Sequence, residues 1–226
     1  MTDELDDLSN EEEEEEEEDT ADFLARLEEE EVEAARAGKS NGARLLRQHQ
    51  FHLAAQYVAI ALCAIPAVRR VVLFGSVALP LKQEKSHYKA ERRAHLPWVW
   101  HECADIDLAV WVNDLSVLKS LQRARGQALN FLLATHGIGV AHHQVDIFIM
   151  KPENDRYLGR LCTFGACPKE KRECNTSGCG KTPLLKAVEG FTWRPDAIHP
   201  AHSICLYDVD GNKVLHESFL LRLMTE

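Results

Sequence analysis

Two stretches of the chain carry apolar residues at helical spacing. Over residues 43–65 the apolar side chains recur every three or four positions until Pro66 ends the pattern. Over residues 115–134 leucines recur in the same way, and Gly137 and Gly139 follow. The periodicity therefore predicts two amphipathic helices, each with one face turned toward a core.

Short unbroken apolar runs lie between and after these helices. They cover residues 71–74, 106–112 and 145–150, and they are too short for buried helices. We therefore expect three buried strands, with a further strand at residues 204–207. The order helix, strand, loop, strand, helix, strand predicts an α/β (α+β) domain with a small mixed sheet flanked by helices. Residues 80–104 lack such a pattern and are basic, which indicates an irregular insertion.

Charge is distributed unevenly along the chain. The 226 residues have a formal net charge of −10, but residues 1–36 hold 19 Asp and Glu and only 2 Arg. The acidic run from Glu11 to Glu18 repels itself and has nothing to bury, and Ser40-Asn41-Gly42 then indicates a break. The predicted organisation is an acidic disordered tail over 1–40, a core domain over 41–152 and a C-terminal extension over 153–226.

Composition argues against several classes of protein. No apolar run is long enough to cross a membrane, and the acidic N-terminus lacks the charge pattern of a signal peptide. We therefore expect a cytoplasmic protein without a membrane partner, not a membrane, secreted or fibrous one. Residues 37–226 hold 24 Lys and Arg against 17 Asp and Glu, a net of +7. This charge suits polyanionic ligands such as nucleotides or nucleic acids.

Three acidic residues are associated with the predicted strands. Asp105 and Asp107 lie two positions apart, so that on an extended strand both point to the same face. Asp146 lies at the start of the strand predicted over 145–150. If the two strands are neighbours, three carboxylates converge, and a cluster of carboxylate oxygens is what a hard cation such as Mg²⁺ binds.

A Gly75-Ser76 pair directly follows the strand predicted over 71–74. Glycine permits close approach of the backbone to a ligand, and the serine hydroxyl can donate to a phosphate or cap a following helix. Because a turn ends many strands, the pair alone is not specific. The order of the pair and the three acids along the chain is the stronger signal.

These motifs resemble the polymerase-β-like nucleotidyltransferase superfamily, and the chain looks most like its small bacterial members with a minimal core. The resemblance covers residues 43–150 and rests on Leu73-Phe74-Gly75-Ser76, Asp105-Ile106-Asp107-Leu108-Ala109-Val110 and Val145-Asp146-Ile147. It implies transfer of a nucleoside monophosphate from an NTP, with ATP expected, to an acceptor, with release of pyrophosphate. By the same resemblance, Gly75 and Ser76 hold the triphosphate. The implied catalytic residues and ligands of two Mg²⁺ ions are Asp105, Asp107 and Asp146.

Four of the seven cysteines fall close together in the C-terminal extension. Without a secretion signal they are expected to stay reduced, and clustered thiols then indicate a metal. A four-thiolate site is the usual structural zinc arrangement, and metal binding would supply folding energy to a stretch with little apolar content. Free thiols, an iron–sulfur cluster and a redox pair are the alternatives. The expected Zn²⁺ ligands are Cys162, Cys167, Cys174 and Cys179.

The leading hypothesis is therefore a Mg²⁺-dependent nucleotidyltransferase whose acceptor is a small molecule, a protein side chain or an RNA end. Because one fold can host all three acceptors, the sequence does not choose among them. Two other hypotheses stay open. One is a non-catalytic interaction module on the same fold, such as the partner of a toxin. The other is a zinc-bearing nucleic-acid-binding protein.

Overall fold

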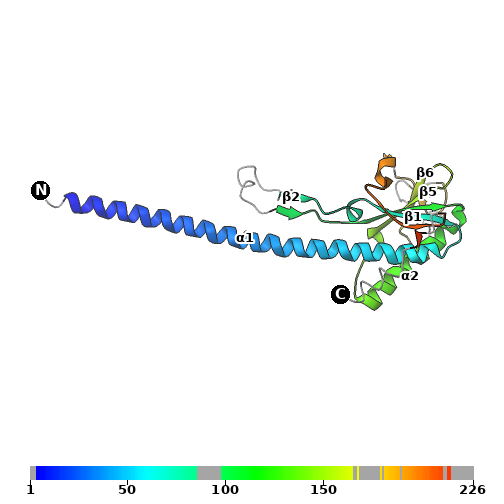
Figure 1. The fold of residues 1–226 in the computed structure, drawn as a ribbon, viewed down its shortest axis with the longest axis horizontal. Coiled ribbons are helices and arrows are strands. Elements are labelled where there is room, and N and C mark those ends of the chain that lie inside the picture. The colour runs from blue at the N-terminus through cyan, green and yellow to red at the C-terminus, as the bar shows by residue number, and fades with distance from the viewer. Residues whose placement is uncertain are drawn as a thin grey trace. The chain divides into compact units, whose positions relative to one another are not determined.

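The computed structural model describes residues 4–85, 98–164, 167, 179, 181–188, 190–210 and 213–214 (Figure 1). The helices are α1 (Glu4–Cys63) and α2 (Leu118–His136), and the short 3₁₀ turns are η1 (Ser76–Ala78), η2 (Leu115–Val117), η3 (His142–Gln144) and η5 (Pro195–Ile198). The strands are β1 (Val68–Phe74), β2 (Gln83–Lys85), β3 (Trp98–Trp100), β4 (Ile106–Val112), β5 (Val145–Lys151), β6 (Arg156–Leu161), β7 (Leu185–Lys186), β8 (Ile204–Asp208) and β9 (Lys213–Val214).

Two compact units make up the chain, and α1 contributes residues to both. The first unit comprises Met1–Leu45 and Lys82–His101, and the second comprises Leu46–Leu81 and Glu102–Glu226. All described residues for which the sequence predicted chemistry belong to the second unit. Among the described residues, no helix is both long enough and apolar enough to span a membrane.

In the first unit, α1 is joined to the β2–β3 pair by hydrogen bonds to one residue. Asn41 Oδ1 accepts a bond from the backbone N–H of Trp100 at 2.7 Å, and the Arg44 guanidinium donates to the Trp100 carbonyl. β3 pairs antiparallel with β2. The insertion over 80–104, expected to be irregular, therefore contains two paired strands.

The course of α1 differs from the sequence prediction. The break predicted at Ser40-Asn41-Gly42 is wrong, because the helix continues through all three residues. A glycine within a helix costs only about 1 kcal/mol, which neighbouring turns can offset. Residues 4–40, predicted as an acidic disordered tail, are helical in the structure.

Seven described strands of the second unit form one mixed sheet. Their order across the sheet is β7-β6-β5-β4-β1-β8-β9. β4 and β5 are parallel neighbours, whereas the other neighbouring pairs are antiparallel. A parallel pair needs a crossover connection, and α2 supplies it here. The crossover places β4 and β5, each with an acidic residue at its second position, side by side near the middle of the sheet.

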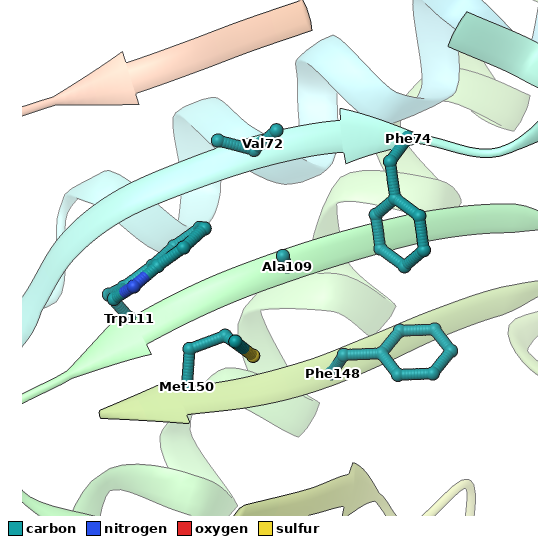
Figure 2. Packing of buried hydrophobic residues seen from close by; sticks show 6 residues of the cluster. All are labelled: Val72, Phe74, Ala109, Trp111, Phe148 and Met150. Carbon is teal, nitrogen blue, oxygen red and sulfur yellow. The ribbon is translucent and has the colours of Figure 1, made fainter. Parts of the chain in front are cut away.

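One face of the sheet is turned toward the helices. Alternation along β4 puts Ile106, Leu108 and Val110 on the same face, and all three are 0% exposed. α2 contributes buried leucines to this layer, among them Leu121 and Leu132. In Figure 2 the helical ribbons lie behind the strands, on the side away from the labelled side chains.

The opposite face carries a second apolar cluster, shown in Figure 2. It is packed by partly buried residues of the C-terminal part of the chain, including Trp193, Ala197 and Ile198. This face therefore has a cover made of irregular chain and a 3₁₀ turn. The buried members of the cluster are Val72, Phe74, Ala109, Trp111, Phe148 and Met150.

The mixed α+β class and a mixed sheet with helices are confirmed. β4 begins and ends where the sequence predicted, whereas β6 and β7 were not predicted. The extension predicted over 153–226 contributes its strands to the same sheet as the core, so residue 152 does not separate two sheets. The shared sheet matters for the candidate site, because β6 pairs with β5 and brings its side chains beside those of β5.

Candidate functional site

Asp107 and Asp146 are aligned across the parallel β4–β5 pair. They are partners in the strand register, so their side chains leave the sheet on the same face from neighbouring strands. Asp146 is 13% exposed at its side chain, which leaves part of the carboxylate accessible to solvent. The sequence predicted this approach on the condition that the two strands are neighbours, and they are.

Gly75 lies against the carboxylate of Asp107. Phe74, the last residue of β1, is the register partner of Asp107, so the chain turns away from the sheet beside that carboxylate. Gly75 has φ 78° and ψ −160°, a backbone conformation open to essentially no residue but glycine. A Cβ at this position would lie 2.5 Å from Asp107 Oδ2. Both the conformation and the close approach therefore require glycine here.

The turn after Gly75 is fixed by side chains from α1. Gln48 Nε2 donates to the carbonyl of Leu79 at 2.6 Å, and a ring nitrogen of His52 contacts the carbonyl of Val77. Burial lowers the pKa of His52, which favours its neutral form. Side chains of α1 thus bind the carbonyls of Val77 and Leu79 and fix the position of this turn beside the acids.

Ser76 does not cap the turn that it begins. Gly75 occupies the N-cap position of η1, and no side chain caps it. The Ser76 hydroxyl instead hydrogen-bonds the thiol of Cys103, which opposes the larger effect of burial in raising the pKa of that thiol. The structure thus brings Gly75 to the acid pair and directs the Ser76 side chain to Cys103.

Negative charge is concentrated at the acid pair. Burial, followed by the charge of Asp146, raises the pKa of Asp107 to about 7. Burial also raises the pKa of Asp146, and Arg160 opposes the shift. Asp105 is exposed just before β4, and its charge acts on both other carboxyls. The three predicted acids therefore lie within electrostatic reach of one another, with Asp107 the most strongly perturbed.

Arg160 is a member of the site that sequence analysis missed. Its Nη1 donates to Asp146 Oδ2 at 2.7 Å, and its guanidinium lies 4.9 Å from the ring centroid of Phe148. Arg160 comes from β6, which follows β5 through a turn at residues 152–155. The segment Pro152-Glu153-Asn154-Asp155 is a turn signal that could have predicted this hairpin and so placed Arg160 beside β5.

The donor set of this site suits Mg²⁺. This ion is usually held through one or two carboxylates and completes its shell with waters and substrate phosphates. Asp107 and Asp146 offer two such carboxylates. Burial and, after it, the charge of Asp146 raise the pKa of Asp107, and a bound cation would neutralise that charge. Within the described ranges, no group of three or more His, Cys, Asp or Glu side chains is arranged to hold a metal ion.

Three of the four cysteines predicted to bind zinc are described, and Cys174 lies outside the described residues. Cys162 and Cys167 are buried. The N–H of Cys162 donates to the carbonyl of Leu184 at 2.8 Å, and Cys179 forms a β-bridge with Lys186. Cys162 is therefore hydrogen-bonded to the residue just before β7 and Cys179 is paired with a residue of β7, which lies beside β6 in the sheet.

Comparisons of this chain with known protein families, with curated proteins and with solved structures found no match. The geometry of the acid pair, the Gly75 turn and Arg160 therefore carries the functional argument.

Proposed function

We propose that the chain is a Mg²⁺-dependent nucleotidyltransferase that moves a nucleoside monophosphate from an NTP, with ATP as the expected donor, to an acceptor hydroxyl. The observation that carries this proposal is the alignment of Asp107 with Asp146 across a parallel strand pair, with the Gly75 backbone against Asp107. An acid pair beside a strand-ending glycine provides cation ligands next to a turn whose backbone can approach a phosphate chain.

In this proposal Asp105, Asp107 and Asp146 would hold two Mg²⁺ ions, and Gly75 and Ser76 would hold the triphosphate. The Ser76 hydroxyl hydrogen-bonds the Cys103 thiol, so Ser76 would act through its backbone N–H. When bound there, Mg²⁺ would neutralise the charge that develops on the attacking and leaving oxygens of an in-line displacement. The absence of a side chain at Gly75 lets the backbone of the turn lie against the Asp107 carboxylate, so that a triphosphate held on the turn would lie beside the proposed Mg²⁺ ligands. Such chemistry depends chiefly on charge neutralisation and on positioning. Rigid strands provide the positioning.

Asp146 is the proposed proton acceptor, and Arg160 orients it. The acceptor oxygen bonds to the α-phosphorus while the bond to the bridging oxygen breaks and pyrophosphate leaves. The hydroxyl proton passes to the Asp146 carboxylate. Because Arg160 engages Asp146 Oδ2, we assign proton acceptance to the other carboxylate oxygen. We propose that this reaction takes place in the cytoplasm.

The first test is calorimetric titration of ATP, GTP, CTP and UTP with Mg²⁺ into the whole protein. Wild type is expected to bind at least one NTP only when Mg²⁺ is present. The Asp105→Asn/Asp107→Asn double variant should bind that NTP at least about tenfold more weakly, because it loses the charges that attract the cations.

The matched control is Asp208→Asn/Asp210→Asn. These two acids have the same spacing and the same charge change, but they lie at the end of β8, where Asp210 pairs with Arg69 at 2.8 Å. Their replacement should leave NTP affinity within about twofold of wild type. A folded wild type that binds no NTP would refute the nucleotidyltransferase proposal and favour the interaction module.

We also propose that Cys162, Cys167, Cys174 and Cys179 bind one structural Zn²⁺. The burial of Cys162 and Cys167 and the return of Cys179 to β7 support this set. Elemental analysis of purified wild type should find about one zinc per chain, and Cys167→Ser should lose it. Cys205→Ser is the control, since Cys205 lies on β8, and it should keep the metal. Full zinc content in Cys167→Ser would contradict the proposal.

A further inference from the structure

Aromatic side chains gather on the same face of the sheet as the acid pair. Trp193 meets Phe74 edge-on at 5.4 Å between ring centroids and stacks on Tyr157 at 5.7 Å with an interplanar angle of 12°. Phe191 lies 5.7 Å from Phe148 and 5.2 Å from Tyr157. We call these five rings the aromatic cluster, and its members come from β1, β5, β6 and the segment before η5.

The aromatic cluster adjoins the acids in the strand register. Phe74 is the partner of Asp107, and Phe148 follows Asp146 by two positions, so it shares the face of that carboxylate. Two positions along a strand correspond to about 7 Å. A group bound at the acid pair is therefore within about 7 Å, along the strand, of the residues that carry the nearest aromatic rings.

Exposure within the aromatic cluster increases toward residues 191–193. Phe148 is 4% exposed and Phe74 is 8% exposed, whereas Phe191 is 37% exposed. Trp193 is partly exposed. Phe191 and Trp193 thus present ring surface to solvent beside a polar site.

Arg160 connects this aromatic surface to the acids. Its guanidinium contacts both Asp146 and the ring of Phe148. A cation at this point suits a ligand that is anionic on the side of the acids and their metal ions and aromatic on the other side. A nucleotide has this composition, with a phosphate chain at one end and a planar base at the other.

We propose that Phe191 and Trp193 form the stacking surface for the base of the nucleotide whose triphosphate binds at the acid pair. The inference rests on the proposed nucleotidyltransferase function and adds the residues that bind the base. Stacking recognises any planar base through its π face, so these rings supply affinity to the nucleoside part of the ligand. The segment that carries them lies outside residues 43–150.

The test separates the base from the phosphates by titrating two probes, ATP and inorganic tripolyphosphate, each with Mg²⁺. Phe191→Leu keeps apolar bulk but removes the ring at an exposed position, so the protein should fold. ATP affinity is expected to fall about fivefold or more in this variant, while tripolyphosphate affinity stays within about twofold. Phe131→Leu is the control, because Phe131 on α2 is also exposed and also contacts another ring, that of Tyr57.

Each outcome decides the inference. Selective loss of ATP affinity in Phe191→Leu, with neither probe affected in Phe131→Leu, supports the stacking surface. Unchanged ATP affinity in Phe191→Leu, or equal weakening of both probes, overturns the stacking surface and leaves the nucleotidyltransferase proposal standing if wild type binds both probes. A wild type that binds neither probe overturns both proposals.

Discussion

Replacement of Asp107 by asparagine is expected to stabilise the protein, without added Mg²⁺, by roughly 2–4 kcal/mol at pH 8. The physical reason is that burial and the neighbouring carboxylates raise the pKa of Asp107 from 3.8 to about 7. Ionised Asp107 therefore opposes folding, and the neutral amide of Asp107→Asn removes that opposition. Urea denaturation of both proteins measures the difference.

The pH dependence follows from the direction of this shift. Below about pH 4 the Asp107 carboxyl is protonated in both the folded and the unfolded chain, so it imposes no penalty. As the pH rises from about 4 to about 7, the unfolded chain ionises first and the stability contributed by the neutral carboxyl is lost. The advantage of Asp107→Asn should thus shrink to about 1 kcal/mol or less at pH 4.5.

Excess Mg²⁺ should reverse the ranking of the two proteins. A cation that binds only the folded wild type stabilises it by mass action, whereas Asp107→Asn has lost one of the proposed ligands. Asp210→Asn is the matched control, because Asp210 is exposed, lies outside the acid pair and pairs only at the surface with Arg69, so its replacement should change stability by about 1 kcal/mol or less with or without Mg²⁺. Equal stability of wild type and Asp107→Asn at both pH values would mean that the acid pair carries no electrostatic strain.

Gly75→Ala is expected to destabilise the protein by about 3 kcal/mol or more. The backbone conformation at Gly75 costs other residues about 1–3 kcal/mol. In addition, the new Cβ would lie 2.5 Å from Asp107 Oδ2, so the turn or the carboxylate must move. Gly75→Ala therefore destabilises the fold and displaces residues of the candidate site. Both the urea midpoint and the NTP affinity should fall.

Gly137→Ala separates these two effects. Gly137 ends α2 with φ 66° and ψ 12°, and a Cβ there would meet nothing within 4 Å. Its replacement should therefore cost about 1 kcal/mol through backbone conformation alone and leave NTP affinity unchanged. Equal losses in Gly75→Ala and Gly137→Ala would show that the contact with Asp107 contributes nothing.

Sequence predicted the parts of the fold whose signal is local. β4 was predicted to the residue, because an unbroken apolar run between polar neighbours defines both of its ends. β6 was not predicted, because its residues include Gly159 and two arginines and therefore show no apolar pattern typical of a strand. Gly159 is needed there because a Cβ would lie 2.8 Å from the Leu185 side chain on β7, a contact made only after the strands pair.

The same distinction applies to the site. The spacing of Asp105 and Asp107 and the position of Gly75 after a strand are visible along the chain, and the structure brings these residues together. Their pairing with Asp146 depends on which strands are neighbours, which sequence alone left open. Arg160 reaches Asp146 only through β6, so it could not be found while that strand was missing. The catalytic roles of these residues stay predictions.

The register of β4 against β5 limits which insertions and deletions leave the two aspartates on the same face of the sheet. Removal of one residue inside either strand would turn its aspartate to the helix-covered face, since strand side chains alternate with a period of two. The connection between the strands, from η2 through α2 to η3, has no such constraint at its two loops, because loops tolerate changes in length. Variants of this chain should therefore differ in the length of the connection around α2 far more readily than in the length of β4 or β5.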